Sequence, residues 1–281
     1  MHMLFIKKGR KMDILNIFLY IIIFTMGTLF GSFYSLAVYR LPKGLDIVKT
    51  HSFCPNCNHK LGFFELIPVW SYIILNGKCK NCKQKIRPRY LILEILSGLV
   101  FVLLAYSLKI NVYSINAEIS IRYAFTILYF VAIFIIAGID QEKRKIEKSV
   151  LYYGVIVSCA YIIYLCIMEK NSIYRYVMYL VILIILLIID ALIQTKKAKD
   201  SYFLETLILL CVMCINTGVI VTIFTVVSLL ILEIIKYVIK FIKNKTNKTL
   251  KTNIDILKNI KNIYLLCIMN IIIYFIFNSI I

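Results

Sequence analysis

Four cysteines in the first polar stretch of the chain have the spacing of ligands for a single metal ion. They form two pairs, Cys54 with Cys57 (CPNC) and Cys79 with Cys82 (CKNC), and 21 residues separate the pairs. Two thiolates on each tight turn can complete a tetrahedral shell around zinc, and a shell of four protein ligands is structural rather than catalytic. The sequence therefore predicts a structural zinc site at these four cysteines.

Other interpretations of this cysteine group are free loop thiols, disulfides, or a shell in which His51 or His59 replaces a cysteine. The polar stretch is too short to bury a core of its own, so metal binding would supply its folding energy. Reducing conditions in the cytosol favour thiolate ligands over disulfides. The other five cysteines lie in apolar stretches, where cysteine packs as a small hydrophobe; they are Cys159, Cys166, Cys211, Cys214 and Cys267.

Acidic residues at the edges of apolar stretches form the second candidate group. The chain has only 14 acidic residues, and an ionisable group within a membrane span is a functional-site hypothesis by default. Six acids lie inside such stretches or at their ends: Glu94, Asp140, Asp190, Asp200, Glu205 and Glu233. Asp140 and Asp200 adjoin basic stretches that we expect on one side of the membrane. Two carboxylates at one depth can form an aspartyl protease dyad, in which one takes a proton from water and the other, protonated, polarises the scissile carbonyl.

These acids have alternative interpretations. Each can be a solvated interfacial residue that balances neighbouring lysines. Asp190 lies a little over two helical turns before the basic stretch that ends at Asp200, so it is the rival for the second catalytic position. Glu94 is expected to pair with a base or to join a polar network.

Long apolar stretches must position both groups. Of the 281 residues, 61% are hydrophobic and 17% are charged, compared with roughly 45–50% and about 25% in soluble domains. Eight stretches approach the ~20 residues that cross a hydrocarbon layer; they are 14–39, 90–108, 121–139, 149–168, 174–194, 202–217, 218–240 and 262–281. Only Asn216, Thr217 and Gly218 interrupt the sixth and seventh stretches, so seven spans is the alternative. The sequence predicts an all-α polytopic membrane protein with about eight transmembrane helices.

Basic residues are concentrated in alternate loops. A net charge of +19 would be compatible with a nucleic-acid partner. However, ten Lys and Arg fall in 40–89 and eight in 236–261, whereas 109–120 and 169–173 hold one each. This alternation is the positive-inside pattern of membrane proteins, in which basic loops are cytoplasmic. We therefore expect a lipid bilayer around the chain, no nucleic-acid partner, and a cytoplasmic zinc loop.

Residues 31–98 resemble the prepilin peptidases, also called type IV leader peptidases. The resemblance lies in Gly31–Pro42 (GSFYSLAVYRLP), the CPNC pair, Glu65–Cys82 (ELIPVWSYIILNGKCKNC) and Ile86–Gly98 (IRPRYLILEILSG), which occur in the order and spacing of that family. Agreement is weaker over about 130–240.

The resemblance implies two catalytic aspartates at the cytoplasmic ends of transmembrane helices. The first family pattern is Ile-Asp followed, after five residues, by a hydrophobic residue and a proline. It maps onto Ile139 and Asp140, with Ile146 at the hydrophobic position and Glu147 where the family has proline. The second, Gly-x-Gly-Asp, maps onto Lys197–Asp200, so lysines stand in place of both glycines. Glycines would let substrate backbone approach closely, and lysine side chains would obstruct that approach.

The resemblance also implies a function. It predicts a membrane aspartyl endopeptidase in the bacterial cell (inner or plasma) membrane that cleaves the leader of type IV prepilins or pseudopilins at the cytoplasmic face. Methylation of the new N-terminus with S-adenosylmethionine is implied by the resemblance alone. The expected parts are an N-terminal segment with the first transmembrane helix (1–42), the cytoplasmic zinc-binding loop (43–89) and a transmembrane helical peptidase-like domain (90–281).

Two other functions stay open. An inactive relative would bind pilins or assembly components without cutting them, and the loss of both glycines favours it. A transporter would couple transport to intramembrane acids and is expected to have helices broken by paired Gly or Pro. All four prolines fall between 42 and 88, which disfavours the transporter.

Overall fold

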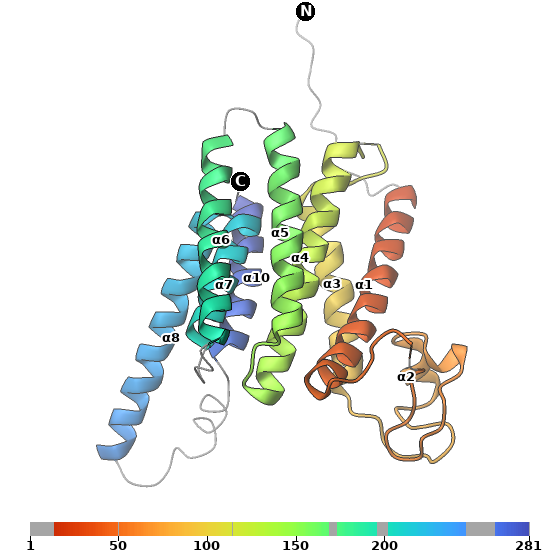
Figure 1. Cartoon of the computed structure of the whole chain (residues 1–281). Coiled ribbons are helices and arrows are strands. Elements are labelled where there is room, and N and C mark those ends of the chain that lie inside the picture. The colour runs from red at the N-terminus through yellow and green to blue at the C-terminus, as the bar shows by residue number, and fades with distance from the viewer. Residues whose placement is uncertain are drawn as a thin grey trace, which may run out of the picture. The chain divides into compact units, whose positions relative to one another are not determined.

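The computed structural model describes residues 14–49, 51–113, 115–168, 173–195, 202–245 and 262–280. Over these residues the chain is helical and contains no sheet (Figure 1). The long helices are α1 (Ile14–Arg40), α3 (Arg89–Ser107), α4 (Ala117–Lys143), α5 (Lys148–Met168), α6 (Ile173–Thr195), α7 (Tyr202–Thr217), α8 (Val219–Lys245) and α10 (Asn262–Ile280). Three short helical turns, η1 (Leu41–Lys43), η2 (Phe63–Glu65) and α2 (Trp70–Ile74), lie between α1 and α3.

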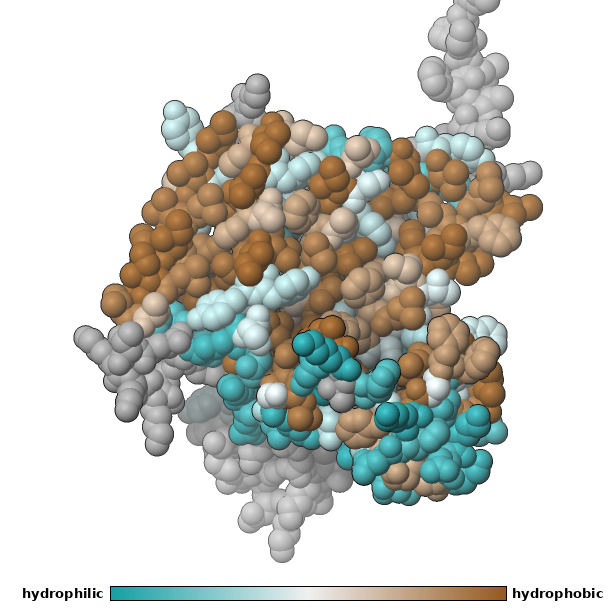
Figure 2. Space-filling model, turned by 45° about the vertical axis from the view of Figure 1, so that its right-hand side comes forward, coloured by the Kyte–Doolittle hydropathy of each residue, from teal (hydrophilic) through white to brown (hydrophobic). Residues whose placement is uncertain are grey.

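Each predicted apolar stretch coincides with one long helix, which confirms the all-α polytopic fold. Six helices are long and apolar enough to cross a membrane, while the apolar helices Phe203–Thr217 and Val219–Ile235 are shorter. The count of eight spans therefore stays a prediction. On the face shown in Figure 2 most side chains are hydrophobic, and the hydrophilic ones gather mainly in the lower part of the view. The chain is a multi-pass membrane protein.

The turn between α7 and α8 is formed as the sequence predicts. Gly218 has a φ of +92°, a left-handed conformation that a side chain would strain. Its N–H donates to the carbonyl of Cys214, and its own carbonyl accepts the N–H of Thr222. One glycine therefore ends one helix and starts the next.

Contacts between Cα atoms divide the chain into two compact units. The first consists of the residues up to Ser32 together with Phe53–Tyr123, and the second of Phe33–Ser52 with Ala124–Ile281. The four-cysteine loop, the beginning of α1 and all of α3 belong to the first unit. The second unit holds Asp140, Asp190 and the helices α5 to α10.

In the first unit, α1 packs closely on α3 through small residues spaced one helical turn apart. A Cβ atom added to Gly27 would lie 2.8 Å from the Cα of Gly98, and one added to Gly31 would lie 2.7 Å from the Cα of Glu94. Such short distances to backbone atoms leave no room for a side chain. Small residues at this spacing are typical of closely packed membrane helices.

We expect Gly31→Ala to destabilise the protein, because the added methyl group meets backbone atoms that cannot move aside without separating the two helices. Overpacking of this kind costs about 1–3 kcal/mol. Thermal unfolding in detergent measures the effect. Gly154→Ala in α5 is the matched control, since its added Cβ would lie 3.6 Å from the nearest side chains; equal unfolding temperatures for the two variants would contradict the close packing.

In the second unit, a buried polar cluster joins helices that are distant in sequence. The hydroxyl of Tyr129 in α4 donates to the Asn270 side chain in α10 at 2.7 Å. The Asn270 amide is 3.3 Å from the hydroxyl of Thr225 in α8. Polar side chains that bond across helices stabilise helix packing within a bilayer. This cluster therefore helps to set the register of α10, whose first turn contacts Asp140.

Candidate functional site: a four-cysteine metal centre and two buried acid sites

Two equivalent turns of the loop present the four cysteines. In the first turn the N–H of Cys54 donates to the carbonyl of His59, and the N–H of Asn58 donates to the carbonyl of Cys54. The second turn repeats this pattern: the N–H of Cys79 donates to the carbonyl of Gln84, and the N–H of Lys83 donates to the carbonyl of Cys79. Asn58 and Lys83 occupy matching positions with φ values of 54° and 59°. The repeated C-x-x-C sequence thus folds into the same turn twice.

The sulfur atoms of the two turns meet. All four lie within 4.8 Å of one another. The Sγ of Cys54 is 3.9 Å from that of Cys82, and the Sγ of Cys57 is 4.0 Å from that of Cys79. Four sulfur ligands at 2.3 Å around a tetrahedral zinc ion would be about 3.8 Å apart. The cluster can therefore hold a metal ion, as its spacing predicts, and its donor set fits zinc.

The thiols of the cluster differ in their affinity for protons. Burial raises the pKa of Cys54 to about 11. Hydrogen bonds from the backbone of Gln84 and the side chain of Asn56 lower the pKa of Cys82 to about 6. A bound cation would stabilise thiolate at all four positions, including Cys54, and would release protons as it binds. Metal affinity is therefore expected to fall as the pH falls.

Two asparagines connect the turns, and their role went unrecognised in the sequence. The side-chain amide of Asn56 donates to the Sγ of Cys82 at 3.7 Å, and that of Asn81 donates to the Sγ of Cys57 at the same distance. Each asparagine therefore supports a sulfur atom of the opposite turn. The shared C-x-N-C pattern of CPNC and CKNC was the available signal.

His59 has another side-chain partner in the loop, and His51 contacts Arg40 through its backbone. The ring of His59 lies 3.2 Å from the Glu65 carboxylate, which also accepts the N–H of Gly62 at 2.8 Å. That N–H, with His59, lowers the pKa of Glu65. The carbonyl of His51 accepts a hydrogen bond from the buried guanidinium of Arg40, which also donates to the carbonyl of Asp46. Among the described residues, only the four cysteines cluster as potential metal ligands.

Asp140, the first predicted catalytic acid, is fully buried near the end of α4. One oxygen of its carboxylate accepts the N–H of Tyr264 at 3.0 Å. Tyr264 lies in the first turn of α10, where backbone N–H groups have no partner within the helix. The positive end of the helix dipole favours a negative charge at this position. Asp140 thus has a structural contact that its sequence neighbourhood does not reveal.

Asp200, the second predicted catalytic acid, lies outside the described residues, as do Lys197 and Lys199. Its rival Asp190 is buried in α6 and accepts a hydrogen bond from the hydroxyl of Tyr152 at 3.0 Å. The ammonium group of Lys148 lies 3.7 Å from Asp190 and 3.6 Å from Glu205 in the first turn of α7. One lysine therefore neutralises part of the charge of two buried acids.

We expect Lys148→Met to destabilise the protein, because Asp190 and Glu205 would lose their shared cation. Breaking a fully buried pair costs 3–5 kcal/mol, and we expect about 2 kcal/mol here because the Lys148 side chain keeps 32% exposure. Thermal unfolding in detergent checks this. Lys145→Met is the control, since the exposed Lys145–Glu147 pair contributes little, and adding Glu205→Gln to Lys148→Met should restore part of the loss. Equal effects of both lysine substitutions would contradict the shared-cation arrangement.

Glu94 in α3 belongs to a polar network rather than to an ion pair with a base. Its carboxylate accepts the N–H of Val69 at 2.7 Å and a hydrogen bond from the Ser32 side chain. The structure therefore supports the polar-network expectation for this acid. Val69 is a β-branched residue at a φ of 64°, an outlier that surrounding contacts must hold in place.

Residues 25–108 match the family described as Bacterial Peptidase A24 N-terminal domain. A prepilin leader peptidase/N-methyltransferase of Vibrio cholerae is 29% identical over 144 residues, which cover 48% of this chain and 53% of the relative. A protein of the same name from Myxococcus xanthus is 37% identical over 81 residues, 29% of this chain and 24% of the relative. Another protein of this name, from Bacillus subtilis, is 39% identical over 80 residues, which cover 28% of this chain and 32% of the relative.

The matched segments thus span about half or less of the length of these relatives. No solved structure matches the chain. Residues 25–108, which the family matches, contain the two cysteine turns, α2 and α3, and they include Gly31–Gly98, where the sequence resembles the prepilin peptidases.

Proposed function

We propose that this chain, which belongs to the prepilin peptidase family by its residues 25–108, is a membrane endopeptidase that removes the leader of type IV prepilins or pseudopilins. The observation that carries the proposal is the family match over residues 25–108, and the similarity to relatives named prepilin leader peptidase/N-methyltransferase agrees with it. The basic loop at 43–89 would face the cytoplasm of a bacterial cell, and cleavage would occur at that face of the inner or plasma membrane.

In the proposed mechanism, Asp140 and Asp200 form the catalytic pair. One ionised carboxylate removes a proton from water, and the water oxygen attacks the scissile carbonyl carbon. The second carboxyl group, which is protonated, donates a hydrogen bond to the carbonyl oxygen. The carbon–nitrogen bond then breaks, and the amine leaves with a proton from one of the acids. The position of Asp140 near the end of a helix long enough to cross a membrane supports this role, because the resemblance implies catalytic aspartates at such helix ends.

The metal centre would have a separate role. Zinc held by Cys54, Cys57, Cys79 and Cys82 would be structural, because four protein ligands leave no position open for water or substrate. It would order the loop rather than take part in hydrolysis. Methylation of the new N-terminus with S-adenosylmethionine is part of the proposal because the relatives carry N-methyltransferase in their names.

A non-catalytic relative that binds pilins is the second candidate, and two observations favour it. Lysines replace both glycines of the expected Gly-x-Gly-Asp sequence, at Lys197 and Lys199. The Asp140 carboxylate contacts the α10 backbone, so a structural role alone could explain its burial.

Cleavage of coexpressed prepilins from the same organism tests the proposal. The intact protein should shorten at least one prepilin, seen as a mobility shift, and mass spectrometry of the product should locate the cut and any added methyl group. If none of the prepilins is cut while the protein still copurifies with one of them, the non-catalytic relative becomes the better explanation.

A further inference from the structure

The loop between the two cysteine turns exposes many large hydrophobic side chains. Within Phe63–Ile74, here called the apolar segment, the most exposed are Phe63 (77%), Phe64 (80%), Trp70 (64%) and Ile74 (72%). Leu66 and Ile73 are exposed as well. Glu65 is the only charged residue of the segment, and His59 and Gly62 already engage it. Contiguous apolar surface on a polar loop is typical of an interaction site.

A hydrogen bond fixes the depth of this segment relative to α3. The N–H of Val69 donates to Glu94 at 2.7 Å, and Glu94 lies five residues after the first residue of α3, Arg89. With a rise of 1.5 Å per residue, Glu94 lies about 7.5 Å along the helix from its start. Basic residues at helix ends lie at the headgroup level of a membrane. The Glu94 side chain points back toward the start of the helix, so, if Arg89 marks that level, Val69 lies close to it, in the region of the headgroups and the uppermost acyl chains.

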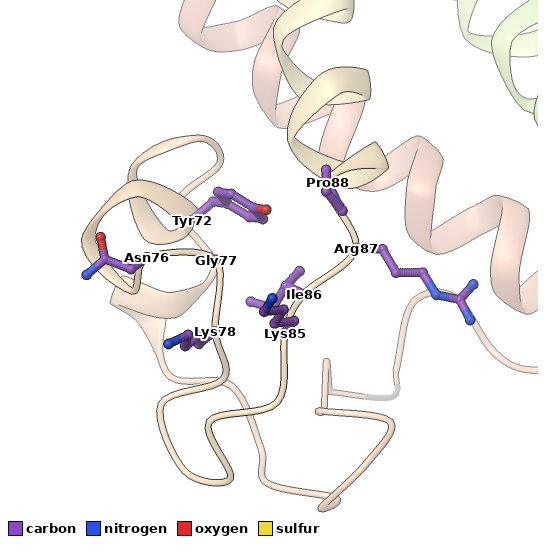
Figure 3. Close-up of a pocket in the computed structure, with 8 residues that line it drawn as sticks. All are labelled: Tyr72, Asn76, Gly77, Lys78, Lys85, Ile86, Arg87 and Pro88. Carbon is purple, nitrogen blue, oxygen red and sulfur yellow. The ribbon is translucent and has the colours of Figure 1, made fainter.

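Basic residues beside the apolar segment lie where α3 begins. Lys78, Lys85 and Arg87 line an open pocket of about 400 Å³ next to Tyr72 and Pro88 (Figure 3). The three cations do not converge on one point, since the Arg87 side chain extends away from the other labelled residues. This distribution suits a surface of many phosphates better than a single small anion.

We propose that the apolar segment is an interfacial membrane element, which inserts its exposed aromatic and aliphatic side chains among lipid headgroups and the upper acyl chains. The nearby lysines and arginine would contact the phosphates of anionic lipids. Segments with an apolar face and basic neighbours bind membranes in this way, with the apolar face about 5–10 Å into the headgroup–acyl boundary. Continuity with α3, whose exposed side chains Ile92, Leu96 and Leu99 are also apolar, favours lipid over a protein partner. The proposal does not depend on peptidase activity.

The intrinsic fluorescence of the protein offers a direct test, because Trp70 is the only tryptophan in the chain. The full chain is reconstituted in phosphatidylcholine vesicles whose acyl chains carry bromine, a fluorescence quencher, either near the headgroup or near the chain end. We expect blue-shifted emission, strong loss of emission with shallow bromine, a smaller loss with deep bromine, and weak quenching by aqueous iodide. Emission typical of water-exposed indole, quenched by iodide and unaffected by bromine, would overturn the proposal.

Two reporter variants calibrate this test. Trp70→Phe with Phe64→Trp moves the reporter within the apolar segment and should again be quenched by shallow bromine. Trp70→Phe with Gln84→Trp moves it to the exposed turn of the second cysteine pair, where iodide should quench it and bromine should not. If both reporters respond alike to bromine and iodide, the segment has no special relation to lipid. Blue-shifted emission that neither quencher reduces would indicate that protein covers Trp70, and would also overturn the proposal.

The charge component is tested separately with the unaltered chain. Replacing part of the phosphatidylcholine by phosphatidylglycerol should increase quenching by shallow bromine, and added salt should reduce the difference. Equal quenching in zwitterionic and anionic vesicles would refute the role of the basic residues.

Discussion

Cys79→Ser is expected to remove the metal from the protein and to unfold the loop between α1 and α3. The described residues of the loop form no sheet and no helix longer than α2, so we expect its order to depend on a metal ion held between its two turns. Structural zinc sites in small peptides supply apparent binding free energies of ≈ 10–16 kcal/mol at pH 7, and serine replaces a thiolate by a poor ligand. Elemental analysis of the purified protein should find about one zinc ion per chain in the parent and none in the variant.

Cys166→Ser is the matched control, because Cys166 lies in α5, away from the cluster sequence, and should leave the metal content unchanged. Limited proteolysis supplies an independent measurement, since an unfolded loop would be cut at its many lysines while the helices stay protected. A variant that keeps the full metal content would show that fewer than four cysteines hold the ion. A parent protein without any metal would overturn the zinc assignment itself.

Features that are encoded locally, by a run of apolar residues, a turn-forming glycine or a repeated motif, could be predicted from the sequence. Apolar runs predicted the long helices, and Asn216–Gly218 predicted the break between α7 and α8, because a glycine with positive φ leaves a local signal. The two cysteine pairs predicted a common metal site, because the same C-x-x-C turn occurs twice. These features depend on residues close together in the chain.

Contacts between distant residues were not predictable. The partner of Asp140 is the N–H of Tyr264, 124 residues away, and any residue other than proline could supply that group. Glu94 likewise accepts a backbone N–H, that of Val69, besides its hydrogen bond from the Ser32 side chain, and no base marks the contact with Val69. Asn56 and Asn81 contact sulfur atoms only because two turns fold against each other. Sequence patterns identify side chains suited to chemistry, but they cannot reveal which backbone groups those side chains will meet.

The two roles of Asp140 can be separated by one substitution. In Asp140→Asn the side-chain carbonyl oxygen can still accept the N–H of Tyr264, so the start of α10 should stay in place and thermal stability should change little. The amide cannot exchange a proton with water or substrate, and loss of a general acid or base lowers rates by about 10²–10⁴-fold. Prepilin cleavage should therefore fall by that factor in Asp140→Asn and in Asp200→Asn.

Asp140→Ala and Asp190→Asn complete the comparison. Asp140→Ala removes both the acid and the contact with α10, so it should lose stability as well as cleavage, whereas Asp190→Asn should retain cleavage because Asp190 is engaged by Tyr152 and Lys148. If Asp140→Asn cuts as fast as the parent, then the carboxylate of Asp140 stabilises α10 and does no chemistry. If Asp190→Asn is the variant that fails, the catalytic pair is Asp140 with Asp190, and Lys148 and Glu205 become part of its immediate surroundings.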